Sequence, residues 1–349
     1  MDLGGLKELE RISQDVGGHP DLVQGGGGNT SAKLGDRFMA VKASGYRLDQ
    51  VTELDGYVIV DYQRVRDYYK DVDRSRDVDF ERESAGFMKE CVLKERNPKD
   101  LRPSIETGFH SFMDKYVIHT HSVYANILCC SKEGKDVAES IFGDGFKMLW
   151  VPYTDPGFEL TIALNDSIRQ YEKEKGYTPN IVFMENHGLI VSAGDAEECL
   201  RLHEKVNAAI IDYFNLGAIY PEIEIEDIGE RGYRSKTSYL QDTLKKRAVG
   251  SRLFKEVILY PDQLVYLGDN VSFEGTGKVN VDPDTGEVVY RTNEVEAVTI
   301  DETFTAYIYV VDKINELGLT LQTMTEEGIS FIRNMEGERY RKSLLKKDS

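Results

Sequence analysis

Basic residues are scarce in this sequence relative to acidic ones. The chain has 43 Lys and Arg against 61 Asp and Glu, which gives a formal net charge of −18. Nucleic acids and anionic membranes are bound through basic patches, so this balance argues against both as partners. A small anionic substrate remains compatible, because backbone N–H groups can bind a phosphate on an acidic protein.

Long apolar stretches and an apolar signal segment are also missing. No run approaches the ~20 apolar residues that a membrane-spanning helix needs, and the opening residues MDLGGLKELERIS have no hydrophobic core. We therefore expect a cytoplasmic protein. The four cysteines form neither a CxxC pair nor a disulfide framework, so we expect reduced core cysteines.

The order of the expected elements indicates the fold class. Strand-like runs alternate with helical segments, and hairpin-like joins recur, unlike the regular βαβ rhythm of a Rossmann domain. The runs lie at 38–43, 57–62, 116–122, 148–153, 181–186 and 189–193. This pattern predicts an α/β fold, a three-layer α/β/α domain with a mixed sheet, over residues 1–218.

The composition becomes acidic and turn-rich after Gly217, which places a linker there. Residues 236–349 then predict a small α+β extension. Its expected elements are a helix at 237–248, a strand at 256–260, a hairpin around 282–287 and a final helix at 324–345. The extension contains no histidine, cysteine or glycine-rich phosphate loop, so its sequence indicates no role for it.

The segment Ile118-His119-Thr120-His121 carries the strongest chemical signal. Side chains two residues apart on a strand share a face, so His119 and His121 can chelate one metal ion. A catalytic zinc ion typically has three protein ligands and one open position. The alternative for the same pattern is a pair of packed core histidines.

The chain has six histidines, which restricts the choice of a third ligand. His19 lies in a glycine-flanked loop, and His203 lies in a charged helical run where we expect it to face solvent. His187 precedes Gly188 at a tight bend between two strands, where glycine lets the backbone come close and the imidazole project from the sheet. His187 is therefore the better candidate, and a purely structural turn histidine is the alternative.

Glu106 falls in the first turn of a helix expected from Pro103 to about Lys115. A glutamate there often only complements the helix dipole. The functional interpretation is that its carboxylate faces the metal and exchanges a proton with a carbon acid. His110 shares its helix face, and we favour a supporting or packing role for it over a fourth-ligand role.

Three turns are candidates for binding an anion. The run GGGGNTS ending at Ser31 matches neither GxxxxGK[ST] nor GxGxxG, but it offers backbone N–H groups and the Asn29 amide. The turn Lys42–Gly45 is the second candidate, and Ser104 at a helix start is the third. Each turn alone also has an ordinary structural explanation.

Together these parts form one mechanism. A metal held by three histidines can chelate two neighbouring oxygens of a ketose and act as a Lewis acid. A carboxylate moves the proton, and a phosphate site orients the scissile bond.

The residues resemble the class II aldolase/adducin family over about residues 10–215. The motifs GGGGNTSAKL, VKASG, RPSIETGFH, HTHS, VPYTDPGFEL and ENHGLIVSAGD occur in the order and approximate spacing of that family. The first and fifth look most like the long branch that includes the aldolase part of bifunctional rhamnulose-1-phosphate aldolases. No GxGxxG follows in this sequence, so we expect no dehydrogenase half.

The resemblance implies a role for each matching position. It implies a mostly antiparallel sheet, one Zn2+ per subunit and a homotetramer. His119, His121 and His187 match the zinc ligands, and Glu106 matches the catalytic acid/base. The phosphate-binding positions are matched by Asn29, Ser44, Gly45 and Ser104.

Two positions depart from the family pattern. Ala43 and Ile105 stand where family aldolases often carry residues able to bind the phosphate. A hydrogen bond to the phosphate is therefore lost or replaced, and Lys42 and the Thr30 hydroxyl are the candidates to replace it.

The resemblance implies zinc-dependent cleavage of a sugar phosphate. The favoured substrates are L-rhamnulose and L-fuculose 1-phosphate, which would give dihydroxyacetone phosphate and an aldehyde such as lactaldehyde. A sugar-phosphate epimerase or dehydratase using the same metal site ranks lower, because family epimerases tend to carry aspartate where Glu106 stands. A non-catalytic adducin-like interaction module is the alternative of another class, and such proteins lose metal ligands that this sequence keeps.

Overall fold

The computed structural model describes residues 4–143, 145–217, 219–247 and 250–335. Its large sheet consists of β1 (Asn29–Lys33), β2 (Phe38–Lys42), β3 (Tyr57–Asp61), β4 (Tyr116–Thr120), β5 (Met148–Val151), β6 (Ile181–Met184) and β7 (Gly188–Ala193). The strands lie in the order β3-β2-β1-β4-β7-β6-β5. Only β5 and β6 pair in parallel, so the predicted mixed, mostly antiparallel sheet is confirmed.

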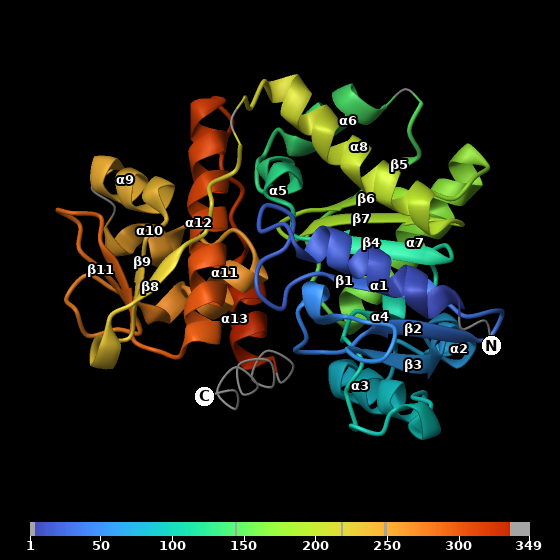
Figure 1. Ribbon diagram of the computed structural model, residues 1–349. Coiled ribbons are helices and arrows are strands. Elements are labelled where there is room, and N and C mark those ends of the chain that lie inside the picture. The colour runs from blue at the N-terminus through green and yellow to red at the C-terminus, as the bar shows by residue number, and fades with distance from the viewer. Residues whose placement is uncertain (1–3, 144, 218, 248–249, 336–349) are drawn as a thin grey trace.

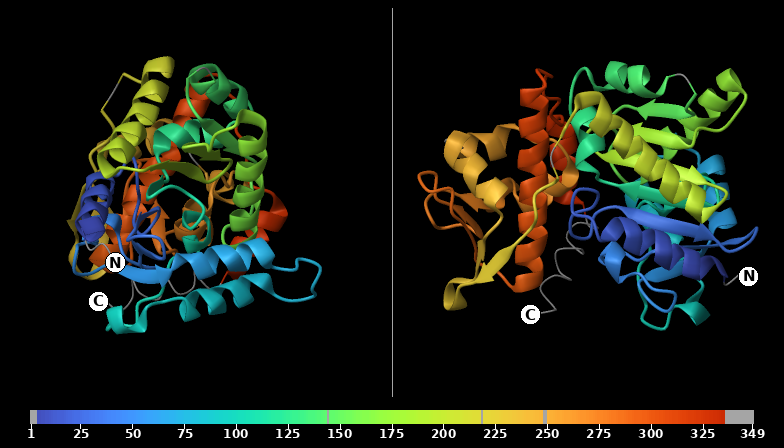
Figure 2. Two further views of the ribbon diagram at one scale, coloured as in Figure 1. Left: turned by 90° about the vertical axis from the view of Figure 1, so that its right-hand side faces the viewer. Right: turned by 45° about the horizontal axis from the view of Figure 1, so that its top comes forward.

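Helices cover both faces of this sheet, which confirms the three-layer arrangement (Figures 1 and 2). One layer contains α1 (Gly4–Gly17), α5 (Val123–Cys129) and α8 (Ala196–Phe214), with α6 (Gly134–Phe142) beside them. The other contains α2 (Tyr62–Asp71), α3 (Phe80–Glu90), α4 (Thr107–His110) and α7 (Phe158–Lys175). No helix of the described residues is both long and apolar enough to cross a bilayer.

The alternation of side chains on β4 decides which face carries the site. Ile118 belongs to the core beneath α1, α5 and α8, whereas Val117 belongs to the core beneath α7. Because side chains alternate along a strand, His119 points to the same side as Val117. The Phe109 ring of α4 meets the His119 ring there, with centroids 5.9 Å apart.

The C-terminal part contains a second sheet and five helices among its described residues. The sheet has the order β10-β11-β12-β9-β8. Its strands are β8 (Ile225–Asp227), β9 (Tyr233–Ser235), β10 (Val271–Ser272), β11 (Val279–Val281) and β12 (Val288–Tyr290). The helices are α9 (Ser238–Arg247), α10 (Ser251–Glu256), α11 (Pro261–Tyr266), α12 (Glu294–Glu316) and α13 (Glu326–Asn334).

Helix α12 lies between the two sheets (Figure 1) and packs against α5. One hydrophobic core includes residues from α1, α5 and α8 together with residues from α11, α12 and α13. The C-terminal part is therefore packed directly onto the large sheet's helical layer. The division into units at 1–218 and 236–349 stays a prediction.

Three expected elements are wrong or shorter than expected. The predicted strand at 256–260 is irregular, because the Leu259 N–H donates to the Gln263 side chain and its carbonyl accepts from the Asn186 side chain. The helix expected from Pro103 to Lys115 is only the four-residue α4, and the Ser111 hydroxyl turns back to the Gly108 carbonyl at its end. The final helix is described only as α13, and residues 336–349 lie outside the described residues.

His203 is buried rather than solvent-exposed, so that expectation is wrong. His203 lies on the face of α8 that packs against the sheet, and its Nε2 is 2.8 Å from the Thr120 hydroxyl. Burial lowers the pKa of His203 to about 4 from its ordinary 6.5. The folded protein therefore takes up this proton at a lower pH than the unfolded chain does, and its stability falls as the pH drops from 6.5 to 4.

We expect this histidine to change the free energy of unfolding by roughly 3 kcal/mol across that interval. Urea unfolding of wild-type and His203→Gln proteins at about pH 6.5, 5.5 and 4.5 measures it. The stability advantage of the wild type should shrink steadily as the pH falls. A constant difference between the two proteins would refute the assignment.

Candidate functional site

Three histidines converge where β4 ends beside the bend between β6 and β7. One ring nitrogen from each of His119, His121 and His187 lies within 4.8 Å of the others. All three side chains are buried, and their ring centroids are 5.0–5.3 Å apart. The structure thus brings together the three histidines that the sequence singled out, in an arrangement that could hold one metal ion.

The bend that carries His187 requires unusual backbone geometry. Asn186 has φ 52°, in the left-handed region that asparagine tolerates better than most residues. Gly188 pairs with Met184 and lies so close to the Thr120 carbonyl that any added Cβ would overlap it. Glycine is needed here because the backbone of β7 approaches the end of β4, and this approach places His187 beside His121.

Each of the three histidines has one buried ring nitrogen without a hydrogen-bond partner among the described residues. Nδ1 of His119 lies 3.0 Å from the Leu189 carbonyl, and Nδ1 of His121 lies 2.6 Å from Asp262 Oδ2. Nε2 of both rings is buried without a hydrogen-bond partner among the described residues, as is Nδ1 of His187. Buried polar atoms without partners are costly, so these nitrogens fit a metal-binding site.

Glu106 lies directly against this group. Its Oε1 is 3.1 Å from Nε2 of His187, and its Oε2 is 3.7 Å from Nε2 of His119. Burial opposes ionisation of the carboxyl, but the imidazoles of His119 and His187 outweigh it and hold the pKa of Glu106 well below its ordinary value. Burial lowers the pKa of His119 well below 6.5. The carboxylate of Glu106 is therefore ionised beside the histidine group.

The register of β1 and β4 places Asn29 beside these residues. Asn29 is the direct partner of His119 across the two antiparallel strands, and its amide donates to Glu106 Oε2 and contacts Ser104 Oγ at 3.4 Å. His110 bonds Asn29 Oδ1 through Nε2 and Ser31 Oγ through Nδ1, the latter at 2.7 Å.

His110 contacts the strand beside the three histidines. Both of its ring nitrogens are engaged by β1, and burial lowers its pKa to about 3, so it is neutral. Its contacts hold the Asn29 amide toward Glu106. The supporting role favoured from the sequence stays a prediction.

Most of the expected anion-binding residues line one pocket together with His121 and His187. The pocket is lined by Gly26, Gly28, Asn29, Lys42, Ser44, Gly45, Ser104, Ile105, Glu106, His121, Pro156, His187, Pro261 and Asp262. Asn29, Ser44, Gly45 and Ser104 are therefore neighbours in space. Lys42 is buried at its wall, and its ammonium donates to the carbonyls of Gly26 (3.1 Å) and Tyr46 (2.7 Å).

Thr30 does not belong to this group, which corrects its assignment as a substitute phosphate ligand. It is fully buried, and its hydroxyl lies 2.6 Å from the Ser13 hydroxyl of α1. Successive side chains of a strand point to opposite faces, so Thr30 points away from the face that carries Asn29.

Asp262 is the site residue that the sequence did not indicate. It follows Pro261 in the C-terminal part and carries no motif, so only the three-dimensional packing of α11 against the pocket identifies it.

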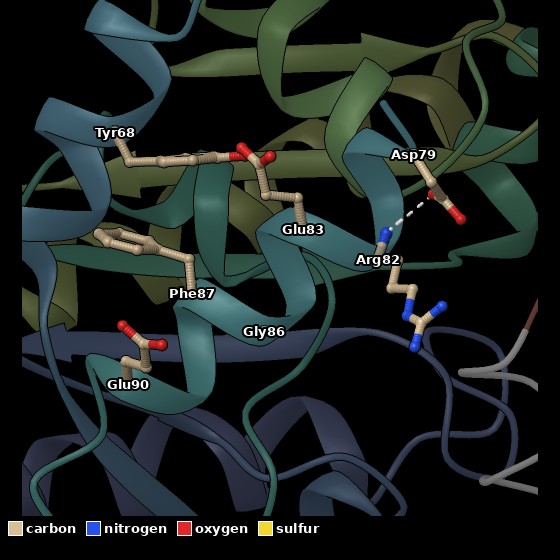
Figure 3. Close-up of a pocket in the computed structure, with 7 residues that line it drawn as sticks. All are labelled: Tyr68, Asp79, Arg82, Glu83, Gly86, Phe87 and Glu90. Carbon is tan, nitrogen blue, oxygen red and sulfur yellow. Dashed lines mark hydrogen bonds between the residues drawn. The ribbon is translucent and has the colours of Figure 1, made fainter. Parts of the chain in front are cut away.

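A second hollow lies on the outside of α2 and α3 (Figure 3). It is lined by Tyr68, Asp79, Arg82, Glu83, Gly86, Phe87 and Glu90. Three of these seven residues carry carboxylates and none is a histidine. This hollow is therefore poorly suited to an anionic substrate or to a metal held by imidazoles.

Sequence comparisons match part of this chain to known proteins. The model of the Class II Aldolase and Adducin N-terminal domain family matches residues 7–211. An uncharacterized oxidoreductase, YuxG, from Bacillus subtilis is 31% identical over 204 residues, which are 56% of this chain and 27% of the relative. The chain thus spans about a quarter of that relative's length.

Solved structures of class II aldolases match part of this chain, with TM-scores below 0.5. The N-terminal class II aldolase domain of a conserved Thermoplasma acidophilum protein has a TM-score of 0.48 at 25% identity, covering 59% of this chain and 92% of that one. An L-fuculose-1-phosphate aldolase from Thermus thermophilus has a TM-score of 0.37 at 12% identity, covering 60% of this chain and 94% of that one.

Proposed function

Because the chain belongs to the class II aldolase and adducin N-terminal domain family, we propose that it is a metal-dependent aldolase that cleaves a ketose 1-phosphate. The observation that carries this proposal is the set of three buried histidines with unpartnered ring nitrogens, with an ionised glutamate 3.1 Å from one of them. Zinc is the proposed ion, since three imidazole ligands with an open fourth position suit a catalytic zinc.

His119, His121 and His187 would hold the metal. When bound, the ion would polarise neighbouring oxygens of the ketose and stabilise the negative charge that develops as the carbon–carbon bond breaks. We propose Glu106 as the group that exchanges a proton with the carbon on which this negative charge develops, since its carboxylate is ionised and lies 3.1 Å from Nε2 of His187.

The phosphate would bind at the glycine-lined end of the pocket. Asn29, Ser44, Gly45 and Ser104 offer an amide, hydroxyls and backbone groups there, and Lys42 adds a positive charge at the wall. Ala43 and Ile105 offer no hydroxyl. The lysine is thus the proposed replacement, and fixing this end of the substrate would orient the scissile bond.

A coupled assay for dihydroxyacetone phosphate tests the reaction. Purified protein is incubated separately with L-rhamnulose 1-phosphate, L-fuculose 1-phosphate and L-ribulose 5-phosphate. We expect dihydroxyacetone phosphate and an aldehyde from at least one ketose 1-phosphate. If L-ribulose 5-phosphate only changed its stereochemistry and neither ketose 1-phosphate were cleaved, the proposed activity would be that of an epimerase and not of an aldolase.

The phosphate end of the pocket gives a separate prediction. Lys42→Met should raise KM for the ketose 1-phosphate by about 10-fold, since a hydrogen bond to a charged group contributes roughly 1.5–3 kcal/mol. Lys115→Met is the control, because Lys115 is half-buried just before β4, at the opposite end of that strand from the histidines. Equal KM values for the two variants would contradict a role for Lys42 in phosphate binding.

A further inference from the structure

Asp262 is the residue through which the C-terminal part contacts the histidine group. Its Oδ2 lies 2.6 Å from Nδ1 of His121, and its side chain is only 2% exposed. It belongs to α11, outside the residues 7–211 that the family model matches. The family comparison therefore assigns this carboxylate no role.

Gly27 shows that the chain leaves room for this contact. A Cβ at Gly27 would lie 2.5 Å from Asp262 Oδ2 and 2.9 Å from His121 Nδ1. Gly27 is not held in the left-handed region, so no backbone strain calls for glycine at this position. The need for glycine comes instead from the hydrogen-bonded pair that packs against it.

A second contact ties the C-terminal part to the bend that carries His187. The Asn186 amide donates to the carbonyls of Leu259 (2.8 Å) and Gln322 (2.7 Å). Leu259 is close to Asp262 along the chain, and its N–H donates to the Gln263 side chain at 3.0 Å. The segment that presents Asp262 to His121 is thus fastened to the residue next to His187.

The turn formed by Gly25–Gly28 also contacts the C-terminal part. Glu302 of α12 accepts the Gly25 N–H at 2.7 Å and forms a two-pronged ion pair with Arg47 at 2.8 and 2.9 Å. These contacts place α12 directly behind the turn that contains Gly27. The C-terminal part therefore meets the surroundings of the pocket at His121, at the Asn186 bend and at the glycine turn.

We propose that Asp262 is a positioning residue of the metal centre, through which the C-terminal part holds His121 in its ligating orientation. The inference rests on the metal site of the proposed function. A carboxylate that accepts the Nδ1–H fixes the ring and its tautomer, which leaves the Nε2 lone pair for the metal and makes that nitrogen more basic.

Metal affinity tests the inference without recourse to activity. Zn2+ and Co2+ affinities of wild-type, Asp262→Asn and Asp262→Ala proteins are measured by competition with a chromogenic chelator. We expect Asp262→Ala to bind each ion about 10–100-fold more weakly, the usual range for lost outer-shell partners. Asp262→Asn keeps an acceptor but not the charge, so its affinity should fall between those of the wild type and Asp262→Ala.

Asp301→Ala is the matched control, because Asp301 is an equally buried carboxylate of the C-terminal part. It accepts hydrogen bonds from Thr237 and Tyr290, at 2.5 Å each, away from the histidines. We expect it to lower the thermal midpoint but to keep the metal affinity and the visible spectrum of the Co2+-loaded protein. Asp262→Ala should change that spectrum, because the His121 ligand moves.

Gly27→Ala tests the same contact from the other side. It should also weaken metal binding, and the Gly27→Ala/Asp262→Ala double variant should bind no more weakly than Asp262→Ala alone, since both changes remove one interaction. Wild-type affinity and an unchanged Co2+ spectrum in Asp262→Ala would overturn the inference while leaving the proposed function intact. A wild-type protein that binds neither ion would overturn both.

Discussion

Replacing Glu106 with glutamine is expected to lower the turnover number for ketose 1-phosphate cleavage by roughly 10²- to 10⁴-fold, the range attributed to a positioned general acid or base. Glutamine keeps the size and the hydrogen bond from Asn29 but cannot exchange the proton. Steady-state kinetics with a coupled assay for dihydroxyacetone phosphate measures the effect.

Bound zinc must be measured in the same preparation, because Glu106 lies against two of the histidines. Glu90→Gln is the matched control, since that glutamate is exposed on the rim of the hollow on α3 and should leave turnover unchanged. A Glu106→Gln protein that carries zinc and cleaves at the full rate would show that another group moves the proton.

Replacing His119 with alanine is expected to remove both metal and activity. One of three protein ligands would account for roughly a third of the ~10–16 kcal/mol typical of a protein zinc site, or about 3–5 kcal/mol. That corresponds to a loss in affinity on the order of 10²- to 10⁴-fold. Zinc affinity by chelator competition and product release by the coupled assay should fall together.

His19→Ala is the control for this second variant. His19 is a solvent-exposed histidine of the loop before the glycine run, far along the chain from the three grouped histidines. Its replacement should change neither zinc affinity nor cleavage. Loss of cleavage in His119→Ala with zinc affinity at the wild-type level would contradict the ligand assignment.

The sheet domain could be predicted from the sequence because its signals are local. Strands such as β6 and β7 are short runs of branched and aromatic residues separated by a turn, and the structure places them as expected. Helix α12 was missed because its sequence carries no local helical signal. Most of its residues are buried, so it has no polar face, and it is rich in the Val, Ile, Thr and Tyr that favour strands.

The grouping of the three histidines could also be predicted, since the His-x-His spacing and the glycine bend at His187 are both visible in the sequence. Asp262 could not be found in this way. It is 141 residues from His121, and an aspartate after a proline is the ordinary start of a helix. Thr30 was misplaced because the choice between the two faces of β1 depends on its pairing with β4, which the sequence alone does not give.

The most direct test of the proposed metal dependence is to titrate zinc into metal-free protein while measuring dihydroxyacetone phosphate release from a ketose 1-phosphate. We expect no release without metal and a rise in rate that ends at one zinc ion per chain, because one three-histidine group is found among the described residues. Full activity in chelator-treated protein shown to be free of metal would contradict the proposal.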